Sequence, residues 1–120
     1  MLGGFADFIV RKNNGDELKF RAQPGFVRFY QAIREPVLDE VDKLMSQLQK
    51  AGRPCTELLI SGHSLGGALA NLGAVDLAAK YPDTKVSLWT YGCMRVFAGN
   101  TKAAAQEDDS AYNGELQVTD

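Results

Sequence analysis

The sequence predicts an α/β fold in a single domain spanning residues 1–120, and three observations support that class. Residues 37–48 place apolar side chains on one side of a helix. Residues 56–61 and 85–91 are short apolar runs beside proline, glycine or aspartate, which favours strands. Residues 65–80, between these runs, have helical spacing and begin at a glycine-rich turn. Because strands and helices alternate, we expect a mostly parallel sheet with flanking helices.

The first half of the chain is predicted to form a hairpin and then a long helix. An Asn-Gly dipeptide separates the apolar runs at 8–12 and 17–20, which is a strong hairpin signal. Helical spacing then extends over about residues 25–50 and stops at Gly52. Pro36 falls inside this pattern, so we expect the helix to kink or break there.

The turn at residues 62–66, Gly-His-Ser-Leu-Gly, carries the strongest functional signal. The preceding strand and the following helix place Ser64 on a sharp strand-to-helix turn, which is typical of the nucleophile of a serine ester hydrolase. Gly62 and Gly66 are expected there because a Cβ at either position would clash in a tight turn. The backbone N–H of Leu65 is then the expected donor to a tetrahedral oxyanion.

The general base is missing from this pattern. His63 is the single histidine of the sequence, and it directly precedes the serine. Neighbouring side chains on a sharp turn point in different directions, so we expect His63 to pack beside the turn and satisfy its ring nitrogens locally. A serine hydroxyl without a base is a poor nucleophile at neutral pH. The sequence therefore indicates a chemistry whose base this chain does not supply.

Three segments share their order and spacing with one protein family. Besides Gly62 to Gly67, residues 24–30 read Pro-Gly-Phe-Val-Arg-Phe-Tyr, like a helix start of the form H-x-G-F-x-x-x-Y. Residues 90–96, followed by Gly99-Asn100, look like a T-F-G-x-P-R-V-G-N stretch after the next strand. With these segments the chain resembles the class 3 lipases, the fungal-type triacylglycerol lipase domain, over about residues 5–100. The resemblance implies a partial α/β-hydrolase fold with a nucleophile elbow.

The chain also departs from the family pattern. Gln23-Pro24 stands where the family has histidine, Met94 stands where it has proline, and Phe97-Ala98 are additional. The family strand that ends in the loop with the second oxyanion donor would lie before Met1. The triad histidine would lie after Asp120, so we expect the chain to be the middle part of a lipase domain.

The resemblance implies hydrolysis of carboxylic esters of acylglycerols or similar lipids, with Ser64 as nucleophile and Leu65 N–H as oxyanion donor. It requires no metal or cofactor. In the family the triad acid follows a strand, and the alternating pattern at 115–119 makes Asp120 the candidate acid. The alternatives are that Asp120 is a terminal surface residue or that the acid lies further along the chain. Weaker candidates lie in loops too early in the order: Asp83, Asp108 and Asp109.

Two other functions stay open at this point. A catalytically inactive lipase-like chain could bind lipid or protein, and the same elbow could serve acyl transfer or a phospholipase. With 13 basic and 15 acidic residues the net charge is -2, and the absence of a basic stripe argues against nucleic acid as a partner. The resemblance allows peripheral contact with a lipid surface. The oligomeric state is not determined by the sequence.

The compartment is also open, with the cysteines favouring an intracellular one. Cys55 precedes one predicted strand and Cys93 follows the next, so parallel strands would place them at opposite sheet ends, about 15–20 Å apart. A disulfide needs Cα atoms within about 7 Å, so we expect two free thiols. No signal peptide or membrane-spanning segment is expected, because the run from Leu2 to Val10 is short and contains Asp7.

Overall fold

The order of elements agrees with the order expected from the sequence. A computed structural model describes residues 4–92, 95–98 and 112–115. Its elements are β1 (Ala6–Arg11), β2 (Glu17–Ala22), α1 (Pro24–Lys50), β3 (Glu57–His63), α2 (Leu65–Lys80), β4 (Lys85–Tyr91), β5 (Phe97–Ala98) and β6 (Tyr112–Glu115). The α/β class is therefore confirmed. Most of the strand expected at 115–119 lies outside the described residues.

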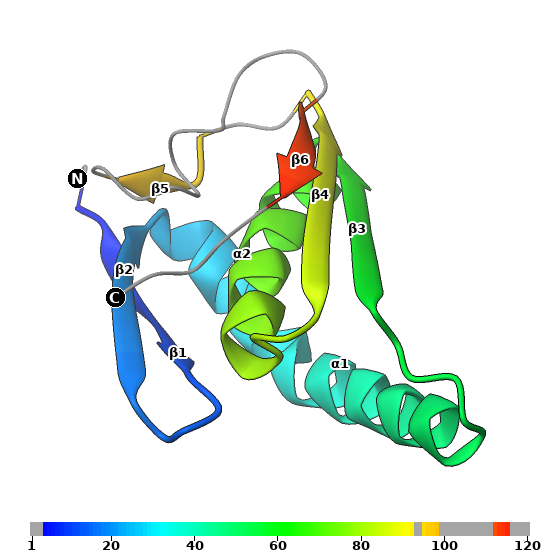
Figure 1. Ribbon diagram of the computed structural model, residues 1–120. Helices are drawn as coiled ribbons and strands as arrows, with labels where there is room; N and C mark the ends of the chain where they lie inside the picture. Colours follow the sequence, from blue (N-terminus) through cyan, green and yellow to red (C-terminus); the bar gives the residue numbers. More distant parts are fainter. Residues whose placement is uncertain (1–3, 93–94, 99–111, 116–120) are drawn as a thin grey trace.

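The strands form two sheets with α2 between them. One sheet has the order β1-β2-β5 and the other the order β3-β4-β6. The β3–β4 pair is parallel, whereas β1–β2, β2–β5 and β4–β6 are antiparallel. The two sheets together thus contain fewer parallel pairs than the mostly parallel sheet that was expected. Figure 1 shows the two sheets on opposite sides of α2, with the second half of α1 extending beyond them. The ends of β3 and β4 meet where α2 begins, which places the expected elbow there.

The long helix α1 begins at a well-defined cap and continues through its proline. The side-chain oxygen of Gln23 accepts a hydrogen bond from Phe26 N at 3.0 Å, and Pro24 occupies the first helical position. The residue that replaces the family's histidine is thus the N-cap of α1. The helix is not broken at Pro36, although proline cannot donate to the carbonyl one turn earlier.

The helix α2 is buried on nearly all sides because sheets cover two of its faces and α1 a third. Leu72, Val75 and other small or aliphatic residues make up most of its buried surface. The polar residues Asn71 and Asp76 are buried as well, since each is only 3% exposed. A helix between two sheets has no solvent face to receive polar residues.

One face of the β3–β4 pair is open. Leu58 and Ile60 pack against the core, whereas Leu59, which points the other way, is 71% exposed. Trp89 and Tyr91 of β4 are also exposed large hydrophobic residues. In the part of the chain that the structure describes, this narrow sheet therefore leaves apolar surface uncovered. Among the described residues, no helix has both the length and the apolar character needed to cross a bilayer.

Candidate active site

Ser64 occupies a strained turn between β3 and α2. Its φ is 55° and its ψ is -118°, and it is the one non-glycine residue with positive φ in the described part of the chain. Such a conformation costs on the order of 1–3 kcal/mol and persists only where the surroundings enforce it. Here Ser64 N donates to Tyr91 O at 2.9 Å, and Ser64 O accepts from Ala68 N at 3.2 Å. The end of β4 and the first turn of α2 thus hold the serine backbone from both sides.

The glycine before the serine is required by the closeness of α2. A Cβ on Gly62 would lie 2.2 Å from Gly66 O and 2.7 Å from Gly67 N, both backbone atoms. Gly66 itself is different, because a Cβ there would meet no described atom within 4 Å. The expectation that both glycines avoid a clash is therefore right for Gly62 and wrong for Gly66. The turn is crowded by the helix backbone at Gly66, and a Cβ added to Gly66 itself would not add to this crowding.

The Ser64 side chain is exposed and does not cap the helix that follows it. Ser64 is exposed and sits at the N-cap position of α2, yet its hydroxyl makes no capping hydrogen bond. Leu65 is the first residue of the helix and is 41% exposed. The first N–H groups of a helix lack intrahelical acceptors and carry the positive end of its dipole. An exposed hydroxyl in this position can attack a carbonyl carbon, and the N–H groups can then stabilise the oxyanion that forms on the carbonyl oxygen.

His63 lies at the end of β3, opposite Tyr91 in the parallel register. It is exposed, and within the described ranges no hydrogen bond is assigned to its ring. The expectation that His63 packs beside the turn with its nitrogens satisfied is therefore wrong. Its side chain offers neither a hydrogen bond to Ser64 nor a structural anchor.

The acidic candidates are not brought to the serine by the described residues. Asp83 precedes β4, whereas Ser64 bonds the last residue of that strand, so about 20 Å of strand separates them. Asp120, the preferred candidate, lies outside the described residues, and so do Asp108 and Asp109. Cys55 is a free cysteine, as expected, and Cys93 lies outside the described residues.

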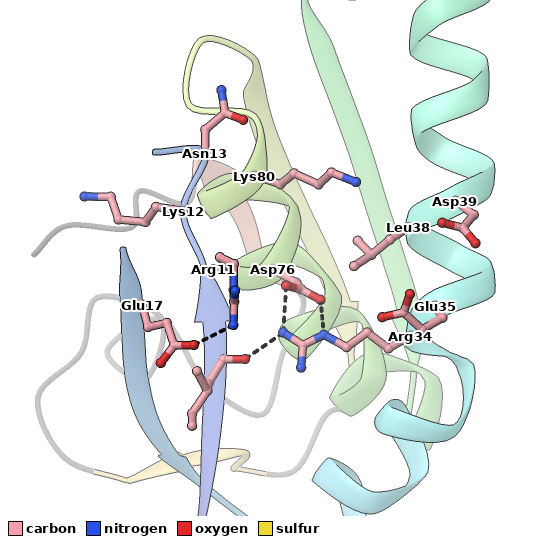
Figure 2. A pocket seen from close by; sticks show the side chains of 11 residues that line it. Arg11, Lys12, Asn13, Glu17, Arg34, Glu35, Leu38, Asp39, Asp76 and Lys80 are labelled. Carbon is pink, nitrogen blue, oxygen red and sulfur yellow. Dashed lines mark hydrogen bonds and ion pairs between the residues drawn. The ribbon is translucent and has the colours of Figure 1, made fainter. Parts of the chain in front are cut away.

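A buried polar cluster that the sequence pattern missed lies further along α2. The Asp76 carboxylate accepts hydrogen bonds from Tyr30 Oη at 2.8 Å, Arg34 Nε at 2.8 Å and Arg34 Nη2 at 2.9 Å. Arg34 Nη2 also donates to Ile9 O of β1 at 2.7 Å (Figure 2). The signal available in the sequence was the spacing of Tyr30 and Arg34, one helical turn apart, and a single acidic residue in the mostly apolar helix at 65–80.

Burial and the carboxylate both act on the pKa values of this cluster. Burial, then the charge of Asp76 and the hydrogen bond to it, raise the pKa of the Tyr30 phenol far above its ordinary value. Burial alone would lower the pKa of Arg34, but the hydrogen bond and charge of Asp76 outweigh it and raise that pKa. The phenol and the guanidinium thus stay protonated, and Arg34 carries its charge beside the acid.

Arg34 and Asp76 of this cluster line a cavity of about 680 Å³ between the β1–β2 hairpin, α1 and α2 (Figure 2). Its lining carries charges of both signs, from Arg11, Arg34 and Lys80 and from Glu17, Glu35 and Asp76. None of its lining residues belongs to the turn at Ser64. This cavity is therefore distinct from the candidate nucleophile and does not provide an apolar site for an acyl chain.

Comparison with known proteins gives concordant matches. The profile of the family described as Lipase (class 3) matches residues 3–119. The secreted mono- and diacylglycerol lipases A of Penicillium cyclopium and Penicillium camembertii are each 37% identical over 84 residues, which is 69% of this chain and 25% of each relative. A crystal structure of a lipase from Rhizopus microsporus var. chinensis superimposes with a TM-score of 0.55 at 26% identity, over 81% of this chain and 31% of that one. The chain thus spans about a quarter to a third of the length of these proteins.

Proposed function

Because the chain belongs to the class 3 lipase family, we propose that it carries the nucleophile of a serine esterase acting on lipid carboxylic esters, with Ser64 as that nucleophile. The observation that supports this most directly is the strained, exposed Ser64 at the start of α2. The two Penicillium relatives are named for mono- and diacylglycerols, so we propose acylglycerols as the substrate class.

The proposed reaction runs in two steps. Ser64 Oγ loses its proton to a base and attacks the ester carbonyl carbon, and Leu65 N–H donates to the resulting oxyanion. The tetrahedral intermediate collapses, the alcohol leaves with a proton from the protonated base, and an acyl-serine remains. Water, deprotonated by the same base, then attacks the acyl-serine; the acyl–Oγ bond breaks, the base returns the proton to Ser64 Oγ, and the fatty acid is released.

The base in this scheme is a histidine other than His63. His63 is adjacent to Ser64 in sequence and exposed at the end of β3, and the 120 residues contain no second histidine. An active form therefore needs an imidazole from beyond these residues. Asp120 remains our proposed acid, because it follows the strand pattern at the expected place in the triad order.

The single histidine also favours a second candidate function. A chain that never acquires a base would keep the elbow geometry but turn over esters only at a residual rate. Such a chain would act by binding lipid or another protein. The exposed Leu59, Trp89 and Tyr91 would then be contact residues.

The test combines mass with serine reactivity. The intact mass of the natively produced protein is compared with 13.1 kDa, and the native form is treated with a fluorophosphonate probe and with a diacylglycerol. The esterase proposal expects a larger mass, a probe adduct on Ser64, and loss of both adduct and turnover in Ser64→Ala. A native mass of 13.1 kDa with no adduct would refute the esterase and favour the binding function.

A further inference from the structure

Where α1 crosses α2, the apolar contact is made by a small residue of α2. The buried surface of this helix includes Leu72, Val75 and Leu77, together with six glycine or alanine residues, among them Gly73 and Ala74. Where α1 crosses, a Cβ on Gly73 would lie 3.6 Å from the Tyr30 ring, so a smooth stretch of α2 faces that ring. Apolar burial is non-directional, and small side chains form shallow ridges that interlock weakly with a neighbour. At this crossing, directional contacts are needed to set the axial position of α2 against α1.

The cluster at Asp76 supplies the directional contacts that this surface lacks. Tyr30 and Arg34, one turn apart on α1, direct three hydrogen bonds onto one carboxylate. The same guanidinium holds Ile9 O of β1, and it lies 5.0 Å over the Phe8 ring. The Asp76 side chain is 5% exposed and the Arg34 side chain 20%, so these charge-assisted bonds are shielded from water. A shift of α2 by an ångström would lengthen or bend them together.

We propose that Tyr30, Arg34 and Asp76 are positioning residues that fix α2 along its axis and thereby hold Ser64 against the ends of β3 and β4. Leu65 is 11 residues from Asp76, about 16 Å along the helix, and a rigid helix transmits an axial displacement over that length. Ser64 is where the displacement would be absorbed, since its backbone is pinned to Tyr91 O on one side and to the helix on the other. The inference rests on the proposed role of Ser64, but its first test does not depend on catalysis.

The test separates positioning from stability. In the triple variant Tyr30→Phe, Arg34→Met, Asp76→Leu, apolar side chains of similar size replace the whole cluster, and such replacements of buried ion pairs are often neutral or stabilising. Hydrogen exchange is then measured at the amides of Ser64 and Ala68, which donate to Tyr91 O and Ser64 O. We expect an unchanged urea midpoint and at least tenfold faster exchange at both amides. An unchanged midpoint with unchanged exchange would overturn the proposal.

Two further variants keep the result decisive. Arg11→Gln with Glu17→Gln removes the exposed ion pair of the hairpin, 2.6 Å long, without touching α2, and should leave exchange at Ser64 unchanged. If the triple variant does not fold, Tyr30→Phe alone decides, because it keeps the ring and the ion pair and removes one hydrogen bond. We expect at least threefold faster exchange at Ser64 in that variant, and wild-type exchange there would overturn the proposal.

Activity gives a second and separate readout. In an active native form, the triple variant should lower kcat at least tenfold with little change in KM, because substrate binding surfaces are untouched. A proportional loss of active enzyme from instability would instead follow the unfolding midpoint. If wild type and Ser64→Ala are equally inactive, the proposed function fails, while the exchange experiment still tests whether the cluster positions α2.

Discussion

The contact between Gly62 and the first turn of α2 gives the sharpest test of the elbow geometry. In Gly62→Ala the new Cβ would lie 2.2 Å from Gly66 O and 2.4 Å from Gly66 C, whereas ordinary contacts begin at 3.4 Å. The helix start must therefore retreat by at least the difference, 1.2 Å. Because the obstructing atoms are backbone, no side-chain rotation can relieve the clash.

The expected magnitude follows from that displacement. Overpacking of a closely packed site costs about 1–3 kcal/mol, and a clash with backbone belongs at the upper end of that range. Gly66→Ala is the matched control, because it adds the same methyl group into open space within a helix. Alanine favours a helix over glycine by up to about 1 kcal/mol, so the control should be neutral or stabilising.

Urea unfolding followed by the fluorescence of Trp89, the single tryptophan, measures both variants. In an active native form, Gly62→Ala should also lower kcat/KM by about 10²-fold, since an ångström of misplacement has that effect. The reasoning is refuted if Gly62→Ala unfolds within about 0.5 kcal/mol of wild type, the range of a neutral surface substitution. It is equally refuted if Gly66→Ala is as destabilising as Gly62→Ala.

Three further outcomes follow from the described geometry. Ser64→Gly should be about 1 kcal/mol more stable to urea than Ser64→Ala, because glycine relieves the positive φ; equal stabilities would mean that the turn stores no strain. Pro36→Ala should raise the free energy of unfolding by about 1–3 kcal/mol, since alanine restores the missing backbone donor inside α1; a loss of stability would contradict this. Above pH 10 the unfolded chain loses its tyrosine protons while the buried Tyr30 phenol keeps its own. Tyr30 should therefore make the free energy of unfolding fall by up to about 1.4 kcal/mol per pH unit. Between pH 9 and 11.5, Tyr30→Phe should make this fall less steep, and an unchanged slope would contradict the prediction.

The elements that sequence analysis predicted are those that depend on local chemistry. The hairpin has its glycine at a φ of 96° at Gly15, and α1 begins and ends close to the expected residues. The strand-turn-helix at Ser64 follows from its glycine spacing and from the apolar run before it. Each of these features is specified within a window of about twenty residues, so periodicity and turn residues suffice to identify it.

The features that were missed depend on distant partners. Phe97 pairs with Ala22 and Ala98 with Arg21, more than 70 residues earlier in the sequence. A strand of two residues has no local sequence pattern from which it could be predicted. The burial of Asp76 could not be predicted, because periodicity identifies the apolar side of a helix but not the number of neighbours around it. A helix between two sheets buries its polar residues too, and each then needs a partner.

The strain at Ser64 also bears on what the serine is for. A glycine at this position would adopt the same backbone without cost, and the side chain does not cap the helix that it begins. The hydroxyl therefore contributes nothing to the fold of the described residues that would offset a strained φ of 55°. Such strain characteristically marks functional sites, where the geometry serves the chemistry rather than the stability. Ser64 is held by Tyr91 O and lies at the positive end of a buried helix, and a Cβ at Gly62 would clash with the start of that helix. This geometry is the one that the proposed nucleophile requires.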